Sequence, residues 1–304
     1  MITITKNIEE ANAITHAGTF HADDVFATVL LEKLNPSLKL ARVTEVKNAK
    51  KEAIIYDIGL GKFDHHQIEN AKYRDNGIKY CSFGLLWKKF GMSYLKQIEM
   101  PVRKDAFEMI DKSLVEEIDA VDNGEFPKIE ALYKVSTLNN MIKNFNVTWI
   151  ENKDNDDAFL EAVQWAKKIF DNEIRATRSK ILARKQVERA LNKSSDTILY
   201  LDEYLPYKEV LQESKKEINF VIFPSNRGGY AINAVNKENE IKELKVPFPS
   251  NWAGLEQKEL EKVTGIKDAT FCHFGQFIAC SKTKEAAFAM AKLALEEYNK
   301  KEDA

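Results

Sequence analysis

The chain has 304 residues, a length that fits two domains of ordinary size or one large one. Hydrophobic residues make up 44% and charged residues 30% of the chain, which is normal for a globular protein. The formal net charge of -2 argues against a protein that coats long nucleic acid through charge alone, because such proteins are usually basic. The three cysteines form no Cys-x-x-Cys pair, which favours a reducing compartment without a disulfide framework.

The first residues contain no apolar stretch long enough for a signal peptide, and no segment approaches the length of a membrane span. We therefore expect a soluble, cytoplasmic protein that does not act at a membrane. A homodimer is compatible with the composition, but the sequence does not fix the oligomeric state.

The first half of the chain alternates strand-like and helix-like segments. Three short apolar segments are expected to be strands: residues 11–15, 38–43 and 53–57. Residues 25–34 predict a helix with Asp23 or Asp24 as its N-cap, and residues 82–90 predict a helix opened by a small polar residue. This alternation is typical of a parallel sheet covered by helices.

A further helix is expected from Phe107 to Val121, because apolar residues recur there at helical spacing, and Asn123-Gly124 is a usual helix end. At about 100° per residue, Asp122 falls at the edge of this apolar stripe and Asp119 falls well off it. The helix geometry favours Asp122 over Asp119 as a site residue without excluding either.

Residues 158–191 contain neither glycine nor proline and many strong helix formers, so they predict a long helix that connects two domains. Its second half is basic, and Arg178, Lys185 and Arg189 can share one face. Such a face can track a phosphate backbone, although a solvated face is the default interpretation.

The last third predicts a smaller α+β domain. Residues 218–223 and 230–235 flank Ser225-Asn226-Arg227-Gly228-Gly229, a pattern typical of a hairpin with a Gly-Gly turn. Residues 269–273 and 276–280 predict a second hairpin around Gly275. Helices are expected at residues 255–263 and 284–298.

Acid and histidine side chains concentrate in two stretches of the first half. One is His16-Ala17-Gly18-Thr19-Phe20-His21-Ala22-Asp23-Asp24, and the other is Asp64-His65-His66. Side chains packed this densely are costly to desolvate, and they are tolerated best where a divalent cation binds them. His16 and Asp57 lie at the carboxyl ends of predicted strands, where open α/β sheets bind ligands, so the set can converge in one cleft.

Carboxylates with imidazoles suit Mn²⁺, Zn²⁺ or Fe²⁺ better than Ca²⁺, which prefers oxygen ligands alone. The ligands are too many for one ion. Two ions about 3.5–4 Å apart, bridged by a carboxylate, would use them all and would hold a hydroxide for attack on phosphorus. Taken singly, each residue is also compatible with a capping, surface or core role, and for His16 alone we favour that interpretation.

Three weaker candidates lie in the last third. Arg227 and the backbone N–H groups of its turn could hold a phosphate, although a bare hairpin turn is at least as good an interpretation. His273 could contact substrate, but a packed core histidine is the commoner case. Trp252 could stack on a base, and a core anchor is the safer prediction.

Asp57 followed by Asp64-His65-His66 resembles motifs two and three of the DHH phosphoesterase superfamily, which includes RecJ-type exonucleases, nano-RNases and family II inorganic pyrophosphatases. The whole chain more closely resembles the melanocyte proliferating gene (MYG) family of metal-dependent hydrolases. The stretches that carry this resemblance run nearly end to end: residues 15–23, 57–59, 64–67, 117–124, 251–255, 263–266 and 271–277.

The resemblance implies a RecJ-like parallel α/β domain with flanking helices over residues 1–155, which would hold the metals and the catalytic residues. It implies a linking helix over residues 156–195 and a C-terminal substrate-binding domain over residues 196–304. It also implies 3′–5′ exonuclease action on RNA.

By the same resemblance, six residues hold two divalent cations that share one carboxylate. The first cation would be held by His16, His21 and Asp57. The second would be held by Asp23, Asp57, His65 and Asp122. His66 would bind the substrate phosphate, and Asp64 would orient a neighbouring imidazole.

The chain departs from these families in three places. Relatives usually carry Asn after the first histidine, where this chain has Ala17. Many members of the superfamily carry an aspartate where His21 stands. Relatives also tend to carry Gly-Gly-His near the C-terminus, where this chain has Ala279-Cys280-Ser281.

The leading hypothesis is a metal-dependent phosphodiesterase acting on short RNA or other oligonucleotides, with Mn²⁺ favoured and Mg²⁺, Zn²⁺ or Fe²⁺ as alternatives. Its catalytic residues would be Asp57, Asp64 and His66, and its substrate contacts Arg227, His273, Arg178 and Lys185. The alternatives are a hydrolase of a small phosphoester, dinucleotide or pyrophosphate, a non-catalytic nucleotide or RNA sensor, and an amide hydrolase.

Overall fold

The computed structural model describes residues 2–67, 69, 71–128, 130, 132–194, 197–237 and 243–302. The chain divides into two compact units, Met1–Ile181 and Leu182–Ala304. The first contains a four-stranded parallel sheet and the second a five-stranded mixed sheet. The predicted α/β fold with a long helix and a C-terminal α+β part is confirmed.

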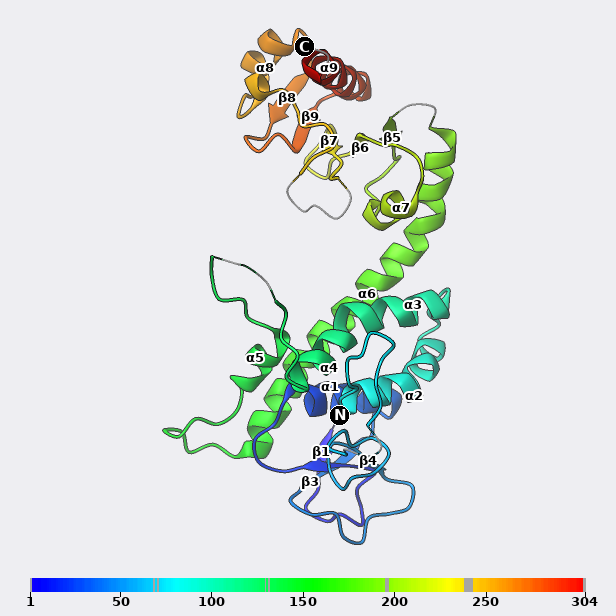
Figure 1. Ribbon diagram of the computed structural model, residues 1–304, viewed down its shortest axis with the longest axis vertical. Coiled ribbons are helices and arrows are strands. Elements are labelled where there is room, and N and C mark those ends of the chain that lie inside the picture. The colour runs from blue at the N-terminus through cyan, green and yellow to red at the C-terminus, as the bar shows by residue number, and fades with distance from the viewer. Residues whose placement is uncertain are drawn as a thin grey trace. The chain divides into compact units, whose positions relative to one another are not determined.

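The first unit is built from short strands and several helices (Figure 1). Its elements are β1 (Thr3–Ile4), β2 (Ala13–His16), α1 (Ala22–Leu34), β3 (Lys39–Val43), β4 (Ile54–Ile55), α2 (Ser82–Gln97), α3 (Arg103–Ile110), a π-helical segment (Asp111–Val115), α4 (Glu116–Asp122), α5 (Leu138–Lys143) and the first part of α6 (Asn155–Lys193). The strand order is β1-β3-β2-β4.

The two faces of this sheet are covered differently, because alternate residues of a strand point to opposite sides. Ala13 and Leu40 pack in the large core that α1, α2, α3, α4 and α6 share. Ile14 and Ala41 lie in a separate small core completed by strand and loop side chains. In Figure 1 the helices α1, α2 and α4 gather on one side of the strands. Among the described residues, helices therefore cover one face of the sheet.

The predicted start of the first helix is wrong by two or three residues. His21, not Asp23 or Asp24, is the N-cap of α1, and Asp24 accepts a hydrogen bond from the backbone N–H of His21. Asp23 and Asp24 are both fully buried. Their position in the first turn, where the helix dipole favours negative charge, suits two carboxylates that face inward.

The predicted third strand and second helix also have different ends in the structure. β4 contains only Ile54–Ile55, and Tyr56 forms an isolated parallel bridge with Phe63. α2 continues past Phe90 to Gln97, and Gly91 within it leaves room for the rings of Trp87 and Phe107.

The single helix expected from Phe107 to Val121 is interrupted by the π-helical segment between α3 and α4. A π turn takes an additional residue, so every later side chain is rotated relative to a regular helical stripe. The inference that Asp119 falls off the buried stripe is therefore wrong. Asp119 is fully buried against Gly84 of α2, where a Cβ atom would have no room.

The second unit contains a sheet of order β5-β6-β7-β9-β8. Its elements are the end of α6, β5 (Ile198–Tyr200), α7 (Lys208–Glu213), β6 (Phe220–Pro224), β7 (Tyr230–Ala234), a 3-10 turn (Ser250–Trp252), α8 (Gln257–Thr264), β8 (Ala269–Cys272), β9 (Ile278–Ser281) and α9 (Lys284–Glu302). Both predicted hairpins are confirmed, since β6 pairs with β7 and β8 with β9 in antiparallel register.

Two cores lie on the faces of this second sheet. Phe220 and Ile222 pack with α9 side chains and with Trp252, which is fully buried as expected. Val221 packs in the other core with Val187 of α6. His273 is exposed in the β8–β9 loop, so the expectation of a packed core histidine is wrong.

The long helix α6 is part of both units, since the boundary falls between Ile181 and Leu182. Its residues from Ala158 to Ile181 contribute to the large core of the first unit, and Val187 belongs to a core of the second. Among the described residues, no helix combines the length and the apolar character needed to cross a membrane. The division into a catalytic domain, a linking helix and a substrate domain stays a prediction.

Candidate metal centre

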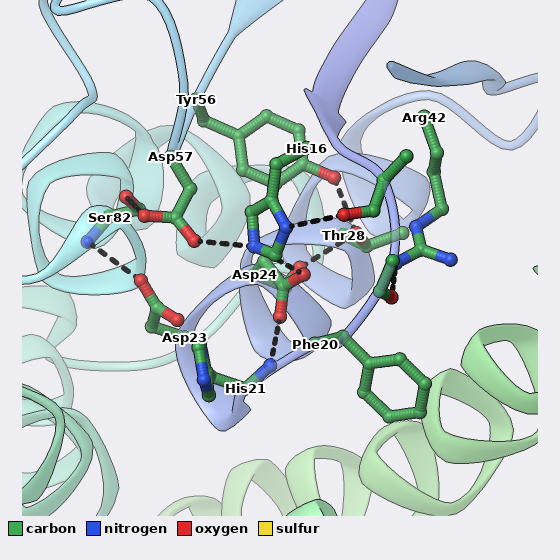
Figure 2. A network of polar contacts seen from close by, with 12 residues as sticks. His16, Phe20, His21, Asp23, Asp24, Thr28, Arg42, Tyr56, Asp57 and Ser82 are labelled. Atoms are coloured by element: carbon green, nitrogen blue, oxygen red, sulfur yellow. Dashed lines mark hydrogen bonds and ion pairs between the residues drawn. The ribbon is translucent and has the colours of Figure 1, made fainter. Parts of the chain in front are cut away.

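The loop from His16 to His21 is held by two side chains that come from elsewhere in the first unit, and Figure 2 shows one of them, Arg42. Gly18 adopts a left-handed backbone with φ of 81°, and its carbonyl accepts a 2.7 Å hydrogen bond from the guanidinium of Arg42. The side-chain amide of Asn146 accepts a hydrogen bond from the backbone N–H of Phe20 and donates one to the carbonyl of Phe20, each of 2.9 Å. These contacts fix the chain that carries both histidines.

The carboxylate of Asp57 lies at the centre of the site. One oxygen, Oδ2, is 3.2 Å from Nε2 of His16, and the other, Oδ1, is 3.1 Å from Nε2 of His65. Asp57 follows β4 in a left-handed conformation with φ of 56°, which is uncommon outside glycine and is tolerated best by Asp and Asn. Such backbone conformations persist where the surroundings hold them, and they concentrate at functional sites.

His65 faces three carboxylates with one ring nitrogen. Its Nε2 is 3.3 Å from Oδ2 of Asp122 and 3.6 Å from Oδ2 of Asp23, in addition to Asp57. Its Nδ1 lies 3.3 Å from Oδ1 of Asn123, the residue that ends α4. A second ring contact of this kind fixes the orientation of a metal-binding imidazole.

The structure groups these side chains into three sets whose potential ligand atoms lie within 4.8 Å of one another. The sets are Asp57, His65 and His66, then His16, Asp24 and Asp57, and finally His21, Asp23 and Asp122. All six residues predicted as metal ligands are thus brought together, with Asp57 shared between two sets. Their assignment to individual ions stays a prediction.

The grouping differs from the predicted ligand sets in two ways. His21 lies with Asp23 and Asp122 rather than with His16, and the ring centroids of the two histidines are 6.2 Å apart. Asp24, which the sequence suggested only as a helix cap, lies with Oδ2 at 3.3 Å from Nε2 of His16. The sequence did offer an indication for Asp24, because it lies next to Asp23 at the start of the predicted helix.

Burial without a counter-cation makes these carboxylates hold protons. Burial, reinforced by the charges of Asp57, Asp122 and Asp24, raises the pKa of Asp23 well above its usual range. Burial also raises the pKa of Asp24, to about 7, although the charge of His16 opposes it. Burial raises the pKa of Asp122 as well, against the charge of His65. Three neighbouring acids of this kind are favourably ionised only beside added positive charge.

The histidines respond in the opposite sense. Burial on its own lowers the pKa of His16, but its hydrogen bond to Asp57 and the charges of Asp24 and Asp57 outweigh burial and raise it to about 9. Burial also lowers the pKa of His65, but its hydrogen bond to Asp57 and the charges of Asp122 and Asp57 outweigh burial and raise it. Burial opposes ionisation of Asp57, yet hydrogen bonds from His16 and His65 lower its pKa below the usual value. In the absence of a cation, the imidazoles supply the charge that Asp57 needs.

The donor set fits divalent cations. Oδ1 of Asp23 is buried and has no hydrogen-bond partner among the described residues, and Oδ2 of Asp24 reaches His16 without hydrogen-bond geometry. The Nδ1 atom of His16 lies 3.2 Å from the carbonyl of Ala17, so Nε2 is left to face the carboxylates. Mixed carboxylate and imidazole donors are typical of Mn²⁺, Fe²⁺ and Zn²⁺ sites.

Asp64 and His66 form a pair at the edge of this cluster. The buried carboxylate of Asp64 accepts hydrogen bonds from the N–H of Leu60 at 2.7 Å and from the N–H of His66 at 3.0 Å. Its Oδ1 also lies 2.7 Å from Nδ1 of His66, whose side chain is 59% exposed. Asp64 therefore supports the imidazole of His66 and belongs to none of the three ligand sets.

The N-terminus of α2 supports the carboxylates, and sequence reasoning missed its first residue as a site residue. The hydroxyl of Ser82 donates a 3.0 Å hydrogen bond to Oδ1 of Asp57, and its N–H donates a 3.4 Å bond to Asp23. The available signal was the small polar residue at a predicted helix start. The preceding residue, Cys81, donates its N–H to the buried carboxylate of Asp119 at 2.9 Å.

Asp119 is fixed in turn by Arg74, whose Nε donates to it at 2.8 Å. Arg74 also pairs with Asp111 of the π-helical segment. Asp119 is thus a structural residue in this geometry, while Asp122, one turn later, reaches His65.

The predicted substrate contacts lie in different parts of the chain. The guanidinium of Arg178 donates a 2.6 Å hydrogen bond to the carbonyl of Ile98, the residue that ends α2. Lys185, Arg227 and His273 are exposed and belong to the second unit. Their role as substrate contacts stays a prediction.

Residues 12–295 match the sequence model MYG1_exonuc, whose description is "Uncharacterised protein family (UPF0160)". The chain belongs to this family. The predicted MYG membership is therefore confirmed, while membership of the wider DHH superfamily stays a prediction.

Relatives match over most of their length. A MYG1 protein of Dictyostelium discoideum is 30% identical over 310 residues, covering 91% of this chain and 94% of the relative. The MYG1 exonucleases of Mus musculus and Homo sapiens are each 29% identical over 319 residues, covering 92% of this chain and 84% and 85% of their own. No solved structure matches this chain.

Replacing Ser82 by Ala removes the hydroxyl that holds Asp57 without adding bulk. We expect Ser82→Ala to lower the affinity of the protein for Mn²⁺ by about 10–100-fold, the usual effect of losing a partner that orients a ligand. Competition titration of the metal-free protein with a fluorescent chelator measures it. Ser93→Ala is the matched control, because Ser93 is an exposed serine of the same helix. Equal affinities for the two variants would rule out this role of Ser82.

The raised pKa values of Asp24 and His16 predict how stabilisation of the protein by metal depends on pH. Without metal, the proton on Asp24 contributes stability that is lost as the pH rises through about 7. The charge on His16 contributes stability that is fully present below its usual 6.5 and is lost as the pH rises through about 9. Because a cation replaces these protons, the increase in Tm caused by Mn²⁺ should grow between pH 6 and pH 8.5.

Differential scanning fluorimetry of the metal-free and Mn²⁺-loaded protein at matched ionic strength measures this increase. An increment in Tm that stays constant or shrinks over that range would contradict the assignment of these groups to a metal centre.

Proposed function

We propose that this chain is a metal-dependent phosphodiesterase that removes nucleotides from the 3′ end of RNA or of short oligonucleotides. The single observation that carries the proposal is the carboxylate of Asp57, which has an imidazole at each oxygen and three further acids around it. The mammalian relatives named MYG1 exonuclease support nuclease action as the broader assignment.

Residues from three elements and one loop would hold the cations. His16 ends β2, Asp23 and Asp24 begin α1, and Asp122 ends α4. Asp57 and His65 come from the loop after β4. When bound, a pair of divalent cations would polarise the phosphate and lower the pKa of a water molecule, which supplies a nucleophile for in-line attack. We take Mn²⁺ as the favoured ion.

Asp57 would be the shared ligand, because each of its oxygens already faces a different potential ligand set. Ser82 restricts rotation of this carboxylate by donating to Oδ1. A shared ligand that cannot rotate would keep each of its oxygens facing its own ligand set during turnover.

His66 would contact the phosphate of the substrate. Its Nδ1 is engaged by Asp64, which leaves Nε2 to face a phosphate oxygen of the substrate. The exposed side chain of His66 contrasts with the largely buried His65, whose Nε2 faces the carboxylates. The two adjacent histidines would therefore have different roles, ligand and substrate contact.

Short, single-stranded substrates agree best with the charge of the chain. A net charge of -2 supplies little attraction for long nucleic acid, so binding would depend on local contacts such as Arg227, His273 and Lys185. Arg178 would contribute only if it released the carbonyl of Ile98.

The test compares Asp57→Asn with Asp105→Asn, a control at an exposed position of α3 in the same unit. Wild-type protein supplied with Mn²⁺ should hydrolyse RNA pentamers and bis-para-nitrophenyl phosphate faster than pyrophosphate. A 5′-labelled RNA should shorten from its 3′ end. Asp57→Asn should reduce these rates by more than about 100-fold, the upper end of the effect of losing a mere supporting partner. Asp105→Asn should retain them.

Two outcomes would replace this proposal. A preference for pyrophosphate over RNA would favour a hydrolase of small phosphoesters. Metal binding that Asp57→Asn abolishes, without turnover of any phosphoester by the wild-type protein, would favour a non-catalytic nucleotide or RNA sensor.

A further inference from the structure

A cavity of about 410 Å³ opens beside the metal centre, entirely within the first unit. Asp64 and His65 form part of its lining, and the hairpin of residues 72–80 forms another. Cavities of this size are in the range that holds small ligands. The position next to His65 means that a substrate at the metal centre could extend into it.

The lining of this cavity is basic, in contrast to the acidic centre next to it. Lys62, Lys72 and Lys79 line it, and Asp64 is the one acid among the described residues of its lining. The carboxylate of Asp64 is already engaged by Leu60 and His66. Among the described residues, Lys72 and Lys79 form no ion pair with a carboxylate, so their charges are available to a ligand.

The hairpin that carries Lys72 and Lys79 is tied to the metal centre. The N–H of Tyr80 donates to the carbonyl of Lys72 at 2.9 Å, which pairs the two arms of the hairpin. The side-chain amide of Asn123 donates to the carbonyl of Lys79 at 3.0 Å, and its oxygen contacts His65. One asparagine thus connects the backbone of Lys79 to the ring of a candidate ligand.

The hairpin is also anchored to α4 and to the π-helical segment. Between its two lysines, Arg74 pairs with the buried Asp119 and with Asp111. Lysines on an element held at both ends are positioned for recognition, whereas lysines on a free loop would contribute only diffuse charge.

The ring of Tyr80, which lines this cavity, is already in contact with two cations. The guanidinium carbon of Arg74 lies 4.7 Å and the amine of Lys88 lies 4.6 Å from the centre of the Tyr80 ring. A ring engaged in this way offers little surface for stacking on a base. Recognition here would therefore be of charge, which lysine provides as a compact cation suited to phosphate.

We propose that Lys72 and Lys79 bind a second phosphate of the substrate, next to the phosphate that is cleaved. The inference rests on the proposed phosphodiesterase activity and narrows its substrate class. The protein would prefer chains with at least two phosphates over esters with a single one, and it would do so without reading the base.

The test uses the double variant Lys72→Ala/Lys79→Ala and the control Lys50→Ala/Lys51→Ala, two exposed lysines elsewhere in the same unit. The substrates are an RNA pentamer and the para-nitrophenyl ester of thymidine 5′-monophosphate, which has one phosphodiester. The variant should raise KM for the pentamer about 10-fold or more, the effect of losing charged hydrogen bonds. Its kcat/KM for the single ester should match that of the control.

Two further measurements separate charge from folding and binding from catalysis. Lys72→Arg/Lys79→Arg should restore KM for the pentamer, because charge is kept. Fluorescence anisotropy of a labelled pentamer, measured with metal bound, should show about 10-fold weaker binding by the alanine variant. Its slope of log affinity against log salt should be less steep by about 0.7, for one phosphate that is no longer neutralised.

The outcomes distinguish this inference from the proposed function. If wild type cleaves both substrates and the alanine variant behaves as the control, the phosphate site is wrong and the activity stands. An equal loss on both substrates would also overturn the phosphate site. If wild type cleaves neither substrate but the alanine variant loses pentamer binding, the activity is wrong and the phosphate site stands.

Discussion

The carboxylate of Asp57 can be buried only if positive charge meets both of its oxygens, and the rest of the first unit depends on this constraint. Removing an ion from water costs several kcal/mol even after the protein relaxes, so a cluster of buried acids is unstable without partners. Imidazoles meet the demand for Asp57, and their raised pKa values are the consequence. For Asp23, Asp24 and Asp122 the nearby positive charge does not compensate burial, and divalent cations would supply the rest.

Helix ends explain much of how the fold tolerates the cluster. Asp23 and Asp24 lie in the first turn of α1, and the N-terminus of α2 donates the N–H and hydroxyl of Ser82 to the site. The N-terminal end of a helix favours negative charge, and this applies to both α1 and α2. Asp122 is different, because it lies at the C-terminal end of α4, where the dipole opposes a carboxylate. Such a placement makes sense for a residue whose partner is a cation.

The cluster itself was predictable from sequence because it is local. His16 and Asp57 follow apolar strand segments, and parallel strands bring their carboxyl ends to one edge. The long helix and the two C-terminal hairpins were equally visible, since length, periodicity and Gly-Gly turns are short-range signals. The residues assigned by resemblance lie together as the site requires, although His21 lies with Asp23 rather than with His16.

What the sequence did not predict depends on long-range contacts. The π-helical segment buries Asp119 against Gly84 and Arg74, and no periodicity rule anticipates an extra residue in one turn. Ser82 joins the site only because α2 starts beside Asp57, which lies 25 residues earlier in the chain. The basic cavity likewise depends on how the hairpin of residues 72–80 folds back towards His65.

In this account the acidic centre binds cations and the basic cavity beside it binds a phosphate of the substrate. Anomalous diffraction from crystals grown with Mn²⁺ tests the central claim most directly. The account predicts two Mn²⁺ peaks about 3.5–4 Å apart, with the carboxylate of Asp57 between them. A single peak that leaves one side of Asp57 without metal, or peaks away from this carboxylate, would contradict it.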